Sequence, residues 1–428
     1  MKSLELPVFA KLLMTTTILM FLLSTDTFAV EAYQVIHRFQ SRSARQPNAA
    51  LVADKIGNLY GTAYLSGPDT CGSQGCGVVF KLTNQPDGKW KYSVIHHFNG
   101  VDGEGPVGGL IFDSLGNLYG TTWRGGQGFG TVFRLSSTSQ GWKETVLYSF
   151  GPAPGDVINP ITALMLDKNG ALYGTAAGGT YEYGGVFRLE RKSDGWKETV
   201  IYNFTGGLDG RSPNGHLVSD SRGNLYGSTD YGGEHHAGVI FKLTPSAVGN
   251  WRETVLHSFK TAPEGGAPGE LIFDRAGNLY GTTQLGGKPT CNVAGPDCGV
   301  VFQLKRSAGL WTLNVLHRFN GADGSTPYAG LVFDSDGNLY GTTPFGGDNN
   351  YGVVFKLSKS VSTWSETVLH SFNLRDGAYP WGGVILSTTG VLYGAAFQGG
   401  IDRNSESGVV YSIAPSGNTT QTPENPSP

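Results

Sequence analysis

Six acidic residues occupy matching places in the loops of this 428-residue sequence, and carboxylates in such a row could bind a cation or transfer protons. They are Asp102, Asp156, Asp209, Glu264, Asp323 and Asp376. The four aspartates Asp102, Asp209, Asp323 and Asp376 are each followed by glycine, which favours a turn in which the acidic side chain caps nearby backbone amides. We prefer the turn, and a bound cation such as calcium is the alternative. The sequence indicates no other cofactor and no metal site.

Glu234, His235 and His236 form a second cluster of metal-ligating residue types, with Asp230 close before it. One glutamate and two histidines could bind zinc. Adjacent histidines rarely point at one ion, however, and the spacing matches no zinc motif. We therefore expect a solvated loop, in which the two histidines are candidates for ligand binding.

Aromatic residues that occur only once among otherwise similar segments are candidates for a binding surface, because exposed rings suit sugar or peptide recognition. The main candidates are Trp123, Tyr181, Tyr183, Tyr231, Phe345, Tyr379 and Trp381, and Tyr351 and Phe397 lie in equivalent loops. Some of them are expected to cap the core instead. No G-x-S-x-G, H-E-x-x-H or P-loop pattern occurs, so no catalytic residue is assigned.

The four cysteines fall into two local pairs, Cys71 with Cys76 and Cys291 with Cys298. Both pairs precede a Gly-Val-Val-Phe run at the same point of a repeated unit. Two disulfides, each closing one long loop, are the preferred interpretation. A four-thiolate metal site is the alternative, but neither pair has the usual metal-binding spacing.

The elements that position these residues come from a repeat. GNLYG or a near copy begins at 57, 116, 170, 223, 277, 337 and 390, which gives steps of 53 to 60 residues. Each unit contains four strand-like runs, A to D, and the second unit shows them at 109–113, 117–122, 130–135 and 142–150. Aromatic residues recur at three positions, which indicates packing between units. We expect the glycine after the tyrosine to admit a ring or backbone of a neighbouring unit.

The count of strands predicts how the repeats close. Runs A, B and C occur seven times, but run D follows only the first six sets, and the seventh D-like run is AYQVIHRF at 32–39. The N-terminal strand can therefore complete the last unit. The prediction is an all-β, seven-bladed β-propeller of four-stranded antiparallel blades, closed by that strand. An open β-solenoid is the alternative, and it leaves the displaced strand unexplained.

The repeated pattern D-x-x-GNLYGTT-x-x-GG, GVVFKL and W-x-ETVLHSF resembles the Gloeo-Verruco (GloVer) tandem repeat from Tyr33 to Ile413. The resemblance implies an exported bacterial repeat protein, of a kind that often carries one of several C-terminal surface anchors. It implies no activity. The tail NTTQTPENPSP lacks the apolar segment or basic end of the known anchors.

The ends of the chain predict an exported protein. Residues 1–29 read as a signal peptide cleaved after Ala29, with an uncleaved membrane anchor as the alternative. Residues 30–414 form the propeller, and residues 415–428 form a disordered Pro/Thr-rich tail. We expect a monomer without a membrane span in the mature chain, located in the periplasm, outside the cell or on its surface.

Function is predicted from the loops. In a four-stranded meander the B–C and D–A loops share one face, and the variable B–C loops make that face the candidate for binding. Net charge is -3 with both signs scattered, which argues against nucleic acid as a partner. We therefore predict a non-catalytic binding protein for an unknown glycan, peptide or protein. A carbohydrate-active enzyme that uses the loop carboxylates is the alternative.

Overall fold

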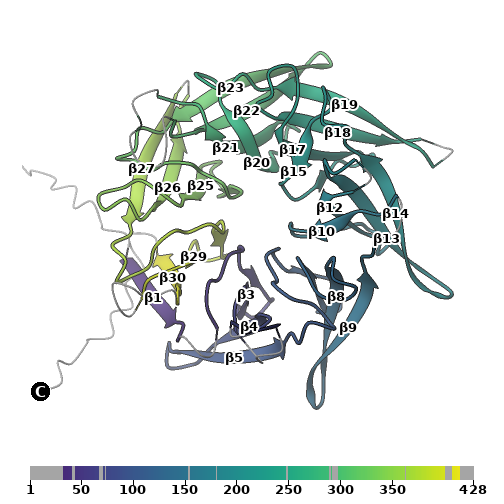
Figure 1. The fold of residues 1–428 in the computed structure, drawn as a ribbon. Helices are drawn as coiled ribbons and strands as arrows, with labels where there is room; N and C mark the ends of the chain where they lie inside the picture. The colour runs from purple at the N-terminus through teal and green to yellow at the C-terminus, as the bar shows by residue number, and fades with distance from the viewer. Residues whose placement is uncertain are drawn as a thin grey trace, which may run out of the picture.

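The computed structural model describes residues 32–40, 44–66, 71–72, 74–152, 155–179, 181–246, 249–288, 291, 297–361, 363–400 and 407–414. These residues form seven small antiparallel sheets arranged in a ring, and each sheet extends from a strand near the centre to a strand at the periphery (Figure 1). The predicted seven-bladed β-propeller is confirmed. The predicted signal peptide and tail lie outside the described residues.

The blades follow one another along the chain. Blade 1 contains β2 (Val52–Ala53), β3 (Leu59–Ala63), β4 (Val78–Asn84) and β5 (Trp90–His97), and blade 2 contains β6 (Ile111–Phe112), β7 (Leu118–Thr122), β8 (Thr131–Thr138) and β9 (Gly141–Ser149). Blade 3 contains β10 (Ile158–Pro160), β11 (Met165–Leu166), β12 (Leu172–Gly178), β13 (Gly185–Lys192) and β14 (Gly195–Asn203). Blade 4 contains β15 (Arg211–Pro213), β16 (Val218–Ser219), β17 (Leu225–Tyr231), β18 (Val239–Pro245) and β19 (Trp251–Ser258).

The remaining blades repeat the arrangement, although the innermost strand is split only in blades 3 and 4. Blade 5 contains β20 (Gly266–Phe273), β21 (Leu279–Leu285), β22 (Val300–Ser307) and β23 (Leu310–Arg318), and blade 6 contains β24 (Val332–Phe333), β25 (Leu339–Thr343), β26 (Val353–Lys359) and β27 (Trp364–Ser371). Blade 7 contains β28 (Ile385–Leu386), β29 (Leu392–Ala396), β30 (Val409–Ala414) and, from the other end of the chain, β1 (Ala32–Arg38).

Strand β1 closes the ring as the strand count predicts. It pairs antiparallel with β30, with Tyr33 opposite Ile413, Val35 opposite Tyr411 and a bulge before His37. The open-solenoid alternative is excluded, because the first and last described strands lie in one sheet (Figure 1).

The GNLYG motif builds the turn between the first two strands of a blade. In blade 2, Asp113 accepts hydrogen bonds from the amides of Leu115 and Asn117, from the Asn117 side chain at 2.7 Å and from the Tyr119 hydroxyl at 3.1 Å. Burial opposes ionisation of Asp113, but these hydrogen bonds outweigh it and lower its pKa. Gly116 has φ +84°, a value that favours glycine. The motif is therefore a scaffold.

The glycine after the tyrosine makes room for an aromatic ring, but the ring belongs to the same blade and not to a neighbouring one. A Cβ on Gly120 would lie 2.6 Å from the Phe133 ring and 2.9 Å from Leu110. Phe133 is on β8, directly opposite Gly120 on β7. The expectation of a neighbouring blade was wrong, because cross-strand pairing brings the two positions together within one sheet.

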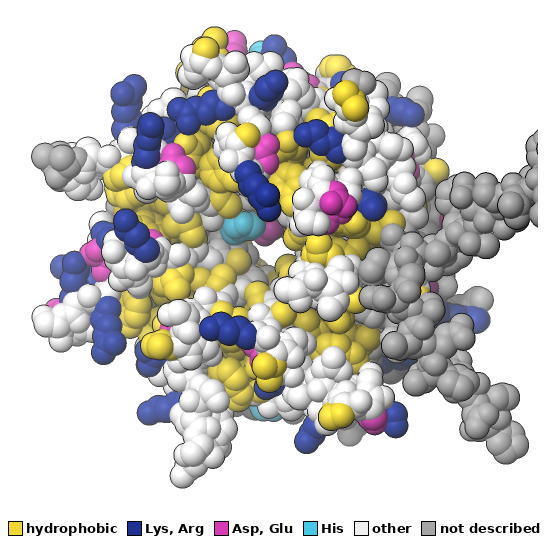
Figure 2. Space-filling model, turned by 180° about the vertical axis from the view of Figure 1, so that it is seen from behind, with side chains coloured by type: hydrophobic (Ala, Val, Ile, Leu, Met, Phe, Trp, Pro, Cys, Tyr) yellow, Lys and Arg dark blue, Asp and Glu magenta, His cyan; other side chains and the backbone are white. Residues whose placement is uncertain are grey.

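Aromatic pairs join neighbouring blades at every seam. The phenylalanine after each outermost strand meets the third-strand aromatic ring of the next blade edge to face, and the ring centroids are 5.1 to 5.4 Å apart. The closing seam has the same pair, Phe39 with Phe80. Figure 2 shows the molecule from behind, with hydrophobic side chains between the charged side chains of the surface loops.

Two disulfides close loops between the second and third strands of blades 1 and 5. Cys71 is bonded to Cys76 and Cys291 to Cys298, with Cα atoms 5.1 and 5.5 Å apart. The four-thiolate alternative is thereby excluded. Disulfides fit a protein that folds outside the reducing cytoplasm. No helix among the described residues has the length and apolar character needed to cross a membrane.

A candidate binding site in the central channel

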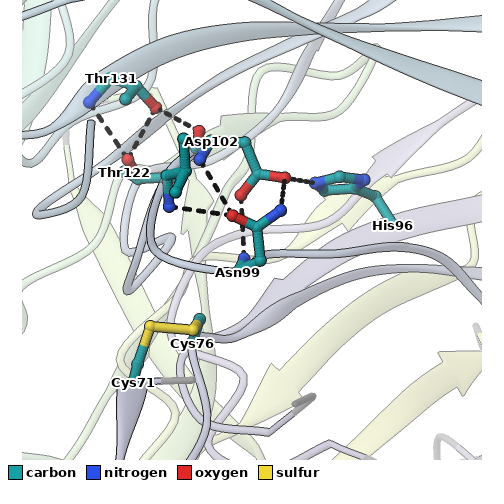
Figure 3. A network of polar contacts seen from close by, with 8 residues as sticks. Cys71, Cys76, His96, Asn99, Asp102, Thr122 and Thr131 are labelled. Carbon is teal, nitrogen blue, oxygen red and sulfur yellow. Dashed lines mark hydrogen bonds and ion pairs between the residues drawn. A yellow bond between two sulfur atoms is a disulfide. The ribbon is translucent and has the colours of Figure 1, made fainter. Parts of the chain in front are cut away.

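The loop carboxylates are used within their own loops. Asp102 accepts hydrogen bonds from the amide and the side chain of Asn99, both at 2.9 Å, and lies 3.3 Å from Nε2 of His96 on the outermost strand (Figure 3). Asp323 repeats the arrangement with Asn320 and His317, and Asp376 accepts a hydrogen bond from the Asn373 amide and lies 3.2 Å from His370. Glu264 lies 3.3 Å from His257. These contacts belong to the capped turn that the sequence favours.

The other two carboxylates accept a hydrogen bond from a tyrosine at the histidine position. Tyr202 donates to Asp209 at 3.1 Å, and Tyr148 donates to Asp156 at 3.4 Å. All six carboxylates therefore contact the outermost strand of a blade. None of them lines the central channel among the described residues.

A glutamate from the next blade approaches the carboxylate at four seams. These seam glutamates are Glu144, Glu198, Glu253 and Glu366. Each has one carboxylate oxygen that is buried without a hydrogen bond. Burial, with the nearby aspartate, raises their pKa to about 8 for Glu198 and about 7 for Glu366.

One seam has the geometry of a possible metal site. The ligand atoms of His317, Asp323 and Glu366 lie within 4.8 Å of one another. Asp323 already accepts two hydrogen bonds from Asn320 and contacts His317, so its oxygens are occupied. Among the described residues no other group of this kind occurs. Glu234, His235 and His236, the zinc alternative, are exposed at the surface of their loop.

The predicted aromatic candidates divide into two groups. Tyr181, Tyr183 and Tyr231 point to solvent, with 55%, 38% and 46% of their surface exposed. Trp123 and Trp381 line one cavity, and Phe345 and Tyr379 pack behind Trp381. The ring centroids are 5.6 Å apart for Phe345 and Trp381, and 5.5 Å apart for Phe345 and Tyr379.

This cavity is an aromatic bowl at the mouth of the channel, with a volume of about 560 Å³. Its lining residues are Gln46, Asn48, Tyr64, Val107, Trp123, Ile161, Tyr328, Trp381 and Phe397. Tyr64, Trp123 and Phe397 each follow the second strand of their blade, whereas Tyr328 and Trp381 come from D–A loops. The bowl is therefore built by five aromatic rings on the face that the sequence predicts.

A smaller cavity of about 250 Å³ continues from the bowl into the channel. One repeat position, the residue before a buried leucine or valine at the innermost strand, lines it in every blade except blade 6. In chain order this position holds Ala50, Gly109, Ala163, His216, Glu270, Gly330 and Gly383. Five of the seven residues are therefore small, and the two exceptions lie side by side on blades 4 and 5.

His216 and Glu270 form an ion pair, with His216 Nδ1 and Glu270 Oε2 separated by 3.0 Å and side chains that are 28% and 31% exposed. Burial opposes both charges. The attraction to Glu270 nevertheless raises the pKa of His216, and His216 with the Gly330 amide lowers the pKa of Glu270. Both shifts favour the charged form of the pair.

A polar chain holds the channel wall beside this pair. Asn214 donates to both oxygens of Asp230, at 3.2 and 3.1 Å, and accepts a hydrogen bond from Tyr328 at 2.8 Å. The Tyr328 ring meets Trp381 edge to face at 5.8 Å. Burial raises the pKa of Asp230 to about 6. These contacts orient Tyr328, which lines both the bowl and the channel.

The sequence analysis missed His216, Glu270, Asn214, Tyr64 and Tyr328. A signal for the first two is present in the repeat, because a histidine and a glutamate replace glycine or alanine at one position in consecutive units. The prediction concentrated on loops of variable length, whereas Glu270 lies on β20 and His216 lies in the short link between β15 and β16.

Comparison with solved structures supports the fold. A fungal alcohol oxidase of the AA5 family, in complex with copper, is 12% identical with a TM-score of 0.53, and the match covers 90% of this chain and 76% of that chain. The extracellular domain of a protein assigned to a hybrid two component system from B. thetaiotaomicron is 11% identical with a TM-score of 0.52, over 87% and 39% of the two chains. A gluconolactonase from Xanthomonas campestris is 15% identical, with a TM-score of 0.42 and coverage of 73% and 87%. At these identities the similarity shows the fold alone.

Sequence comparison identifies the repeat itself. A comparison with curated proteins finds no match. The profile of the Gloeobacter/Verrucomicrobia repeat matches residues 20–178, 69–293 and 249–425, three overlapping ranges that span nearly the whole chain. The GNLYG-type repeats that build the seven blades are therefore those of a known family, and the chain belongs to the Gloeobacter/Verrucomicrobia repeat family.

Proposed function

We propose that the protein is an exported binding protein that holds a sugar ring of a glycan in the aromatic bowl. The bowl itself carries the proposal. Aromatic rings offer flat apolar surfaces to the C–H face of a sugar, and the amides of Gln46 and Asn48 can exchange hydrogen bonds with its hydroxyl groups. None of the described residues that line the bowl has a formal charge.

The rigid wall supports binding without a large rearrangement. Trp381 is packed against Tyr328 and Phe345, and Tyr328 is hydrogen-bonded to Asn214. A preorganised aromatic site loses little conformational freedom when a ligand binds. The loop carboxylates, which the enzyme alternative needs, are held in turns at the outer strands.

A glycan array followed by calorimetry tests the proposal. Trp381→Ala removes one of the two indole rings of the bowl and should weaken glycan binding at least about tenfold. Trp123→Ala should have a similar effect. Tyr181→Ala and Tyr231→Ala are matched controls, because they remove exposed rings that do not line the bowl and should leave affinity unchanged.

Three results would contradict the proposal. The first is glycan affinity that survives Trp381→Ala in a protein of unchanged melting temperature. The second is turnover of a bound glycan, measured as released product, which would make the protein an enzyme. The third is binding of peptides without binding of glycans.

A further inference from the structure

We infer that the His216–Glu270 pair sets the charge class of the ligand, so that the site accepts an uncharged sugar and rejects an anionic one such as a uronate. The inference rests on the proposed function and makes it more specific. It assigns a specificity role to two residues below the bowl.

The pair is not needed by the fold. Glycine or alanine occupies the same position in the other five blades, and each of those blades has the same neighbouring strands. A charged group on the channel wall also loses hydration. Two such groups in consecutive blades, 3.0 Å apart, therefore indicate a role in the channel.

The pair leaves no positive charge for an anionic ligand. His216 is the only basic side chain among the described residues that line the bowl and the channel cavity, and Glu270 neutralises it. A uronate in this space would lose water without gaining a cationic partner, and it would lie near the Glu270 carboxylate. A neutral sugar has no charge to dehydrate, and it can hydrogen-bond to either member of the pair.

Gly330 shows that the position of Glu270 is built into the site. Its amide donates to Glu270, and a Cβ on Gly330 would lie 2.5 Å from Glu270 Oε2. Gly330 does not have a positive φ, so the fold does not need glycine there for its backbone. Ala50 and Ala163 occupy the same repeat position, which shows that the blade tolerates a methyl group.

The experiment compares two probes, the neutral hexose glycan with the strongest array signal and the same glycan with its terminal hexose oxidised at C6 to the uronate. Binding is measured at pH 5. Burial opposes the charge of Glu270, but its contacts with His216 and the Gly330 amide lower its pKa and favour the ionised form in the native protein, and the low pH counters the burial that opposes protonation of His216 once Glu270 is removed. The native protein should prefer the neutral probe at least tenfold. Glu270→Gln should bring the two affinities within about threefold by strengthening uronate binding.

Two further variants distinguish an effect of the His216 and Glu270 charges on binding from an effect of misfolding. His216→Asn combined with Glu270→Gln should lose the gain in uronate binding, because the cation is gone. Gly330→Ala should produce part of the gain while keeping every charge, because it displaces Glu270. Melting temperatures confirm folding, and Gly330→Ala still tests the inference if Glu270→Gln does not fold.

The outcomes are distinct. A native protein that binds both probes equally, or an unchanged affinity ratio in both Glu270→Gln and Gly330→Ala, overturns this inference and leaves glycan binding intact. A native protein that binds no glycan overturns the proposed function and this inference with it.

Discussion

The seam glutamates show how one side chain links neighbouring blades. Glu198 on β14 approaches Asp156 in the loop before its own blade, and burial raises its pKa to about 8. Two carboxyl groups can share such a site only if one of them holds a proton. At two other seams a tyrosine occupies the same position and stacks on a histidine. Tyr92 lies 4.3 Å from His37, and Tyr33 lies 3.6 Å from His370.

Stability should therefore depend on pH in a defined direction. Folding raises the pKa of the four seam glutamates above the ordinary value of 4.5, so their stabilising effect is complete below about pH 4.5 and is lost as pH rises through about 7 to 8. The raised pKa of His216 acts in the same direction. Histidines with a lowered pKa, such as His37, are neutral in both states at the upper end of this range. The melting temperature should fall between pH 6.5 and pH 8.5.

Glu198→Gln tests the cause of this fall, because glutamine keeps the shape of a protonated carboxyl group. The variant should reduce the fall in melting temperature by more than the other three glutamates would singly, because Glu198 has the highest pKa of the four and keeps its proton over most of this pH range. The exposed Glu182→Gln is the control and should change nothing. A Glu198→Gln profile parallel to the native one would contradict this assignment.

At the scale of the element, each blade depends on a close approach between its second and third strands. Gly120 lies opposite Phe133, and the phenylalanine ring occupies the space above the glycine. The same ring also meets Phe98 of the preceding blade at 5.1 Å. One glycine thus allows both the packing of a sheet and the contact between sheets.

Gly120→Ala should destabilise the protein by about 1–3 kcal/mol, because the new methyl group would overlap Phe133 and Leu110. Gly109→Ala is the matched control. Its Cβ would find ordinary contact at 3.4 Å, so the cost should stay within about 0.5 kcal/mol. Urea unfolding measures both. Adding Phe133→Leu should recover part of the loss, and purely additive effects would count against steric overlap.

These elements also show which features of the structure could be predicted from the sequence. Turn residues such as Asp113 and Gly116 act on their immediate neighbours, and the displaced strand at 32–39 left a gap that only closure explains. The direction of a loop side chain is not local in this way. Asp230 hydrogen-bonds to Asn214 at the channel, whereas the next residue, Tyr231, points to solvent. His216 and Glu270 meet only because the ring places blades 4 and 5 side by side.

At the scale of the whole molecule, the ring is held by contacts that β1 makes on both sides. It pairs with β30 within blade 7, and Tyr33 stacks on His370 of blade 6. On the other side Phe39 packs on Phe80 of blade 1, and His37 stacks on Tyr92 of the same blade. Loss of this strand would therefore affect three blades.

Removal of residues 32–39 should leave β30 as an unpaired edge and cause association between chains. We expect a lower melting temperature and oligomers in size-exclusion chromatography with light scattering. A synthetic peptide with the sequence of residues 32–39 should restore the monomer when added in excess, by adding the missing strand. A truncated protein that stays monomeric with native stability would show that the strand is dispensable.

Closure by β1 also orders events in time. Residue 32 is synthesised first and residue 414 last among the paired positions, and at 5–20 residues per second about 20–80 s separate them. Each of blades 1 to 6 can form as soon as its own strands have been synthesised. Strand β1, in contrast, has no partner until β30 has been synthesised at the other end of the chain. A chain interrupted anywhere before residue 409 leaves β1 without that partner. Pairing of β1 with β30 can therefore occur only in a chain that contains all seven repeats.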